Sequence, residues 1–119
     1  EAADIAVLKV QPLGGVRACL RIAEDIGMPV VVSSAVESSI GIAAGVALAA
    51  ALPELHHACG LATVQLLTHD LGQPSMLPVD GMLEVRPVEA LDGFGASDER
   101  TAWWLARYER VKGMMDSCD

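Results

Sequence analysis

Aromatic residues are scarce in this chain of 119 residues: they make up 3% of it, whereas hydrophobic residues make up 52%. A core must therefore be built from Ala, Val, Leu and Ile. Basic residues are also few, and the net charge is −8. This charge argues against nucleic acid as a partner, because phosphate binding needs a basic surface. It argues equally against an anionic membrane surface.

Metal-binding and membrane-spanning patterns are missing as well. The cysteines Cys19, Cys59 and Cys118 lie far apart and form neither a CxxC pair nor a zinc-ligand spacing. We interpret them as reduced thiols, which favours a cytoplasmic protein. The longest apolar run, residues 40–52, is shorter than the roughly 20 residues that a membrane span requires, so we expect no membrane span. No phosphate-binding glycine loop is present.

Strands and helices are predicted to alternate in the first part of the chain. Residues 4–10 and 29–33 are predicted strands, residues 15–26 and 40–52 are predicted helices, and residues 61–67 form a weaker third strand. The second strand is continuously apolar, as expected for a parallel strand that is covered on both faces. This order is typical of βαβ units, so the sequence predicts an α/β fold with a parallel sheet.

Beyond Asp70, proline and glycine interrupt the chain often. Two short extended segments are predicted near residues 76–79 and 82–86, joined by a turn at Asp80 and Gly81. These segments do not continue the strand–helix alternation of the first part.

The last predicted element is a helix over residues 98–115, with Ser97 as its cap. Four side chains recur at helical spacing on one face of it: Trp104, Tyr108, Val111 and Met115. We interpret this face as a docking surface rather than a cofactor site.

One lysine stands where parallel α/β folds collect catalytic groups. Lys9 ends the apolar run of residues 5–8, and a Pro/Gly turn follows it at once; the only other lysine is Lys112. Active sites of such folds gather at the carboxyl ends of the strands. Lys9 is therefore the candidate catalytic residue.

Two more segments fall at equivalent places, just beyond strand ends. Ser33 and Ser34 offer hydroxyls, backbone N–H groups and a following helix N-terminus, which together favour an anion. Gly60, followed by Leu61, lets a ligand approach the backbone closely. We predict these four residues as a substrate-binding rim. A cation beside two anion-binding turns indicates a small-molecule carboxylate as the substrate.

Three stretches of sequence resemble one known family. Residues 3–15 (ADIAVLKVQPLGG) resemble the sixth-strand segment of the o-succinylbenzoate synthase family, in the enolase superfamily, and residues 29–41 (PVVVSSAVESSIG) resemble its seventh-strand segment. Residues 49–55 (AAALPEL) and 58–61 (ACGL) resemble its approach to the eighth strand. The resemblance implies a (β/α)7β barrel with an α+β capping domain. Residues 1–70 would then hold the last three barrel strands, and the rest, 71–119, a C-terminal piece of the capping domain ending in a helix.

The resemblance also implies an activity: the Mg²⁺-assisted dehydration of 2-succinyl-6-hydroxy-2,4-cyclohexadiene-1-carboxylate to o-succinylbenzoate in menaquinone biosynthesis. Lys9 matches the sixth-strand lysine of the family, which implies an acid/base or electrostatic role. The family's second lysine and its three magnesium-binding carboxylates have no counterpart here and would precede Glu1. No metal ligand is therefore expected in this chain. The missing N-terminal part of the enzyme is expected as a partner, and the chain alone is expected to be inactive.

Two alternatives remain open at this point. Related barrels racemise N-acylamino acids, epimerise dipeptides or lactonise muconate, and they share the same lysine and metal chemistry. A free-standing, non-catalytic α/β module that binds a partner through its Trp-bearing helix is the other alternative.

Five further polar residues are not assigned to the site. Glu37 lies near a helix start, where the dipole favours an anion. His56 and His57 are not expected to bind a metal, and Asp70 beside His69 is interpreted as a solvated loop residue.

Overall fold

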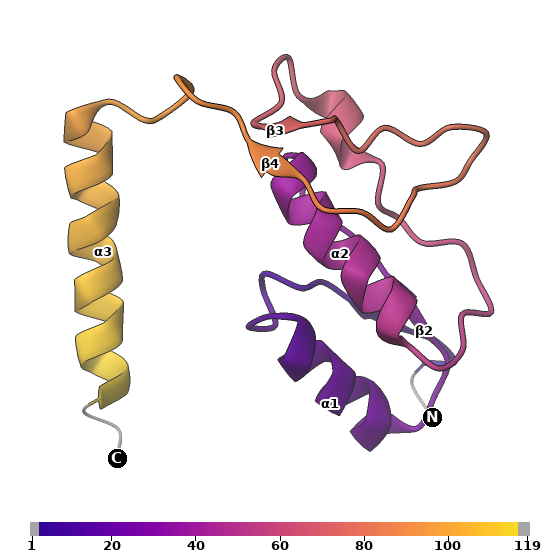
Figure 1. The fold of residues 1–119 in the computed structure, drawn as a ribbon. Helices are drawn as coiled ribbons and strands as arrows, with labels where there is room; N and C mark the ends of the chain where they lie inside the picture. The colour runs from indigo at the N-terminus through magenta and orange to yellow at the C-terminus, as the bar shows by residue number, and fades with distance from the viewer. Residues whose placement is uncertain (1–2, 117–119) are drawn as a thin grey trace.

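Two short parallel strands and two helices form the first part of the molecule (Figure 1). The structure is a computed structural model that describes residues 3–116. Strand β1 (Ala6–Leu8) pairs in parallel with β2 (Val30–Val32), so that residues 6 and 30 and residues 8 and 32 lie side by side. Helices α1 (Val16–Ile26) and α2 (Ser39–Ala51) lie on one side of these strands and pack against each other. The predicted α/β order of these four elements is confirmed.

The two helices begin and end within one residue of the predicted bounds. Helix α1 ends at Gly27, which adopts a left-handed conformation (φ 58°) that glycine accepts without strain. Helix α2 is apolar all round, and Ile42 and Leu48 are completely buried in it. A side chain at Gly45 would lie 2.6 Å from Leu61 Cδ2, so the absence of one lets the following segment pack directly on α2.

The predicted third strand over residues 61–67 is wrong. Only Gly60 pairs with the sheet, through a single parallel bridge to Ser33, and Thr63–Leu66 form a 3₁₀ helix, η1. Leu61 and Val64 are both 4% exposed. In a strand, residues 61 and 64 would point to opposite faces, whereas the turn into η1 lets both side chains reach the core.

Two extended segments were predicted near residues 76–79 and 82–86. The structure has only a single antiparallel bridge there, between Val79 and Met82. The predicted turn between them is confirmed: Asp80 (φ 50°) and Gly81 (φ 77°) both have positive φ, as a two-residue hairpin turn requires. The regular pairing in this region lies elsewhere, between β3 (Gly72–Gln73) and β4 (Glu89–Ala90). Strand β3 also contacts α2, so the chain around β3 packs against that helix.

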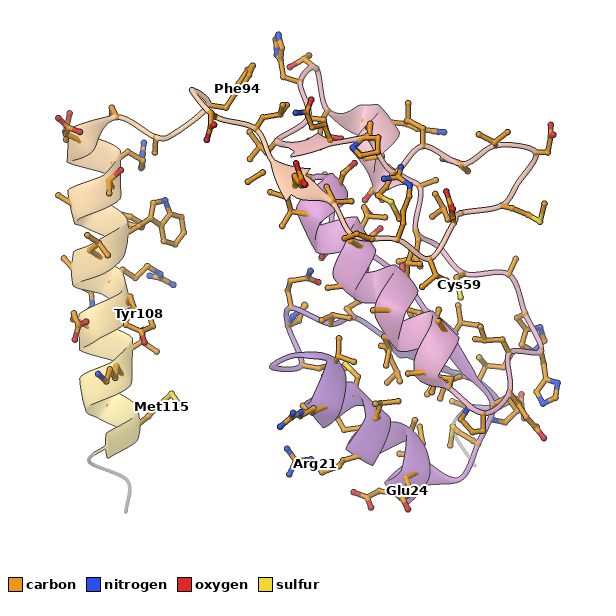
Figure 2. The ribbon with its side chains drawn as sticks, in the orientation of Figure 1. Arg21, Glu24, Cys59, Phe94, Tyr108 and Met115 are labelled. Carbon is orange, nitrogen blue, oxygen red and sulfur yellow. The ribbon has the colours of Figure 1, made fainter. Side chains whose placement is uncertain are left out.

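The C-terminal helix α3 (Asp98–Asp116) is confirmed, and it stands apart from the other elements (Figure 1). The hydroxyl of Ser97 accepts the backbone N–H of Arg100 at 3.3 Å, as expected of a cap. The predicted apolar face is exposed: Tyr108 and Met115 project from one side of the helix in Figure 2. Across residues 3–116, no helix is both long enough and apolar enough to cross a membrane.

Candidate functional site

The ammonium group of Lys9 lies against the loop that follows β2. Lys9 comes directly after β1 and is half-buried. Its Nζ donates a hydrogen bond to the backbone carbonyl oxygen of Ser34, and it lies 3.5 Å from Ser33 Oγ. Because β1 and β2 are parallel and in register, their carboxyl ends meet, and this places the lysine beside the two serines.

Ser34 is the most constrained residue of this rim. It is 4% exposed, and both its backbone N–H and its hydroxyl bond to the carbonyl oxygen of Gly60, at 3.0 and 2.9 Å. Its hydroxyl also lies 2.8 Å from Thr63 Oγ1. Every polar group of Ser34 therefore has a partner inside the chain. The hydroxyl of Ser33 is more available to bond a ligand than that of Ser34, since its contacts with Lys9 Nζ and Ser34 O, at 3.5 and 3.4 Å, are long.

Gly60 and Leu61 contribute to the rim in different ways. Gly60 is exposed, and its N–H bonds to the Val32 carbonyl at 2.9 Å. A side chain here would approach Ser33 Oγ to 3.1 Å, so glycine keeps the space beside that hydroxyl open. Leu61 is buried against Gly45 of α2. A ligand can therefore meet Leu61 only through its backbone.

The loop between Ser34 and α2 is held in an unusual conformation. Val36 has φ 63°, a left-handed value that a β-branched residue rarely adopts. On either side of it, the Ala35 N–H donates to Glu37 Oε1 at 2.9 Å and the Glu37 N–H donates to Thr63 Oγ1 at 3.4 Å. Glu37 thus has a local partner beside the start of α2.

Thr63 is the residue of this network that sequence reasoning missed. It begins η1, and its hydroxyl contacts both Ser34 and Glu37, which flank the bend at Val36. The only signal in the sequence was a hydroxyl residue three positions after Gly60. The incorrect strand prediction for this segment concealed the direction of its side chain.

The interpretation of Asp70 as a solvated loop residue is wrong. Its Oδ1 accepts the backbone N–H of Ser39, the first residue of α2, at 2.8 Å. Its Oδ2 accepts the hydroxyls of Ser39 and of Ser75, the latter at 2.6 Å. Burial of Asp70 acts to raise its pKa, but the hydrogen bonds from these groups and from the Leu71 N–H outweigh that effect and lower the pKa to about 2. Asp70 therefore caps α2 from a distant loop.

Replacing Asp70 with asparagine in the full-length protein is expected to lower the free energy of unfolding by about 2 kcal/mol at pH 7. This figure follows from the pKa of Asp70, which folding lowers from 3.8 to about 2, because each pKa unit corresponds to about 1.36 kcal/mol. Because the folded pKa is depressed, this stabilisation is present above about pH 4 and is lost as the pH falls towards 2. Urea unfolding of both proteins at pH 7 and at low pH measures it. Asp80→Asn, on the exposed turn, is the control. An equal difference at both pH values would contradict the capping role.

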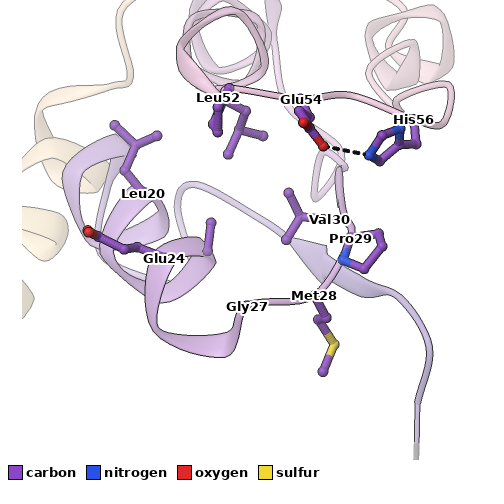
Figure 3. Close-up of a pocket in the computed structure, with 11 residues that line it drawn as sticks. Leu20, Glu24, Gly27, Met28, Pro29, Val30, Leu52, Glu54 and His56 are labelled. Atoms are coloured by element: carbon purple, nitrogen blue, oxygen red, sulfur yellow. Dashed lines mark hydrogen bonds and ion pairs between the residues drawn. The ribbon is translucent and has the colours of Figure 1, made fainter.

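A pocket of about 610 Å³ opens at the other end of the strands (Figure 3). It is lined by Leu20, Val30 and Leu52, and at its side Glu54 and His56 form a pair 2.9 Å apart. None of the predicted site residues lines it. We take the rim at Lys9 as the candidate site, because its ammonium group and the Ser33 hydroxyl lie at the carboxyl ends of the strands, where active sites of parallel folds gather.

Within residues 3–116, no three His, Cys, Asp or Glu side chains come together where they could hold a metal ion. The described residues therefore do not fit a magnesium site. The chemistry that the Lys9 rim can perform is that of an ammonium group and a hydroxyl.

Comparison with known proteins places this chain in a family. Residues 1–99 match the family model described as "Enolase C-terminal domain-like". The o-succinylbenzoate synthase of Thermobifida fusca (strain YX) is 63% identical over 120 residues, which cover 100% of this chain and 38% of that protein. The o-succinylbenzoate synthase of Mycobacterium leprae (strain TN) is 50% identical over 121 residues, which cover 98% and 36%. The chain thus spans little more than a third of the length of these relatives.

Solved structures give the same fold. The muconate lactonizing enzyme from Pseudomonas putida is 30% identical with a TM-score of 0.65, over 85% of this chain and 29% of that chain. The muconate cycloisomerase from Pseudomonas fluorescens is 31% identical with a TM-score of 0.65, over 86% and 29%.

Proposed function

Because this chain belongs to the enolase C-terminal domain-like family, we propose that it is the C-terminal part of an o-succinylbenzoate synthase. The full-length enzyme would be a lyase that dehydrates 2-succinyl-6-hydroxy-2,4-cyclohexadiene-1-carboxylate to o-succinylbenzoate in menaquinone biosynthesis. Identity of 50–63% to synthases over nearly the whole chain supports this assignment. The observation that carries the proposal for the site is the Lys9 ammonium held on the Ser33–Ser34 rim.

Lys9 would act on the carbanion that forms next to the substrate carboxylate. Removal of the α proton leaves its electron pair as an enediolate, hydroxide leaves from the ring, and the ring becomes aromatic. An ammonium group close to the enediolate stabilises its developing charge, and the same Nζ can hold or deliver a proton. Both roles need the position observed here, on the rim rather than in bulk solvent.

Ser33, Ser34, Gly60 and Leu61 would bind the substrate's carboxylate at the same rim. The hydroxyl of Ser33 would donate to the carboxylate, because its contacts within the chain are long. Gly60 has no side chain to cover this hydroxyl. Leu61 would contribute through its backbone, because its side chain is buried. Ser34 would contribute through its carbonyl oxygen, which holds the Lys9 ammonium, because its N–H and its hydroxyl are both engaged.

Magnesium would be held by residues of the enzyme outside this chain, since the described residues do not fit a metal site. When bound, it would supply positive charge to the enediolate. The roles given above to Lys9 and the serines depend only on residues of this chain.

The missing N-terminal part of the enzyme would be the partner of this chain. Within residues 3–116, β1 pairs only with β2, which leaves its other edge for a neighbouring barrel strand. Residues 1–70 would complete that barrel, and residues 71–119 would belong to the capping domain, where the apolar face of α3 would be covered. Reduced, widely spaced cysteines favour a cytoplasmic location.

A related reaction on another substrate is the second candidate, because the muconate enzymes share the fold. Their identity of 30–31% is well below the 50–63% to the synthases, which favours the synthase reaction. A non-catalytic module is the third candidate, and the position of the Lys9 ammonium on the serine rim argues against it.

Substrate comparison tests the assignment. The chain, extended at its N-terminus to the length of its relatives, is expected to turn over the cyclohexadiene acid in the presence of Mg²⁺, and to do so at a kcat/KM at least about 100-fold above that for muconate or an N-acylamino acid. Steady-state kinetics on the three substrates measures this. A preference for either of the other two would overturn the synthase assignment and leave the family unchanged.

A further inference from the structure

We propose that Thr63 is a positioning residue, which fixes the Lys9 ammonium by holding Ser34 in place. This inference rests on the proposed function of Lys9. It adds a residue of η1 to the site, although Thr63 itself does not contact Lys9.

The anchor of the ammonium is a backbone carbonyl. Lys9 Nζ donates to the Ser34 carbonyl oxygen, whereas its contact with Ser33 Oγ is at the 3.5 Å limit for a hydrogen bond. The position of the ammonium therefore depends on where Ser34 is held. Three contacts hold it: two to the Gly60 carbonyl and one to the Thr63 hydroxyl.

The direction of each hydrogen bond follows from the number of hydrogens available. Ser34 has one hydroxyl hydrogen, and the Gly60 carbonyl, 2.9 Å away, can only accept it. The 2.8 Å contact between Ser34 and Thr63 must then use the hydrogen of Thr63. The oxygen of Thr63 is left to accept the Glu37 N–H at 3.4 Å. The threonine hydroxyl is thus used as donor and acceptor together.

These two bonds hold both ends of the bend at Val36. A residue in a sparsely populated backbone region costs roughly 1–3 kcal/mol and persists only where its surroundings enforce it. Ser34 precedes Val36 and Glu37 follows it, and Thr63 binds both. Without the threonine hydroxyl, the bend can relax, and the Ser34 carbonyl would move away from the lysine.

The test uses the full-length enzyme with Thr63→Val and Thr63→Ser. Valine keeps the branched shape and removes both hydrogen bonds, whereas serine keeps the hydroxyl. We expect Thr63→Val to lower kcat by about tenfold or more, because small displacements of a catalytic group carry large rate penalties, with KM changed by less than about threefold. Thr63→Ser should restore kcat to within about threefold. Equal losses in the two variants, or no loss with valine, would overturn the proposal.

A double variant separates positioning from general damage to the fold. If Thr63 acts through Ser34, Ser34→Ala combined with Thr63→Val should reduce kcat no more than about twofold below the worse single variant, because residues that share one network are not additive. Independent effects would instead multiply, and this outcome would contradict the proposed route.

A readout without substrate keeps this inference separate from the proposed function. The rate at which an amine-acylating reagent labels Lys9, followed by peptide mass spectrometry, should rise in Thr63→Val, while the rate at exposed Lys112 stays the same and serves as the internal reference. An unchanged Lys9 rate overturns the positioning role. Failure of the wild-type enzyme to turn over the cyclohexadiene acid overturns only the assigned reaction.

Discussion

Replacing Lys9 with alanine in the full-length enzyme is expected to lower turnover by several orders of magnitude and to leave Mg²⁺ affinity nearly unchanged. The variant loses the group that stabilises the enediolate or transfers its proton, and each of these effects contributes roughly 10²- to 10⁴-fold. Mg²⁺ affinity should hold because an ammonium group has only donor hydrogens and cannot be a metal ligand, and Lys9 Nζ bonds to the Ser34 carbonyl. Steady-state kinetics and calorimetric titration of Mg²⁺ measure the two quantities.

Lys112→Ala is the matched control for this experiment. It removes the chain's other lysine, which is exposed on α3 far along the sequence from the rim, and turnover should stay close to that of the wild type. A loss of less than about tenfold for Lys9→Ala, roughly 1.4 kcal/mol, would mean that the role given to Lys9 is wrong. A large loss of Mg²⁺ affinity would instead place the lysine beside the metal.

The 119-residue chain alone is expected to show no Mg²⁺-dependent turnover at all. It spans 36–38% of its relatives, and none of its described residues converge to hold a metal. The second lysine and the magnesium-binding carboxylates that the resemblance implies are expected outside this chain. The assay compares the purified chain with the full-length enzyme at equal concentration and saturating Mg²⁺.

Circular dichroism of the same sample accompanies that assay, so that helical content is known when turnover is measured. Turnover that depends on Mg²⁺, and that disappears in the Lys9→Ala form of the chain, would show that the residues of this chain complete a site by themselves. That result would contradict the division of the site between two parts of one enzyme.

The helices could be predicted from sequence because their signals are local. Gly27 marks the end of α1, and Ser97 marks the start of α3, through backbone preferences that hold in most contexts. The meeting of Lys9 with the serine loop follows from one topological fact: parallel strands bring their carboxyl ends to the same edge.

The roles of Asp70 and Thr63 could not be predicted in the same way. Asp70 bonds to a residue 31 positions away, and Thr63 to one 29 positions away, so their partners are set only once η1 and the following loop fold back onto α2. The prediction of a strand over residues 61–67 was wrong for a related reason, because an apolar run of that length fits either a strand or a helical turn. The structure has the helical turn, with Leu61 packed against α2.

Lys9 bonds to a neutral group, the Ser34 carbonyl, and this affects which ligands the site can attract. No carboxylate forms an ion pair with this ammonium within residues 3–116; its anchor is a peptide oxygen, which fixes the direction of the group and cancels none of its formal charge. The full unit of positive potential is therefore left for an incoming anion, in a chain whose overall charge would otherwise repel one. A glutamate in place of the carbonyl would have oriented the lysine equally well and neutralised it.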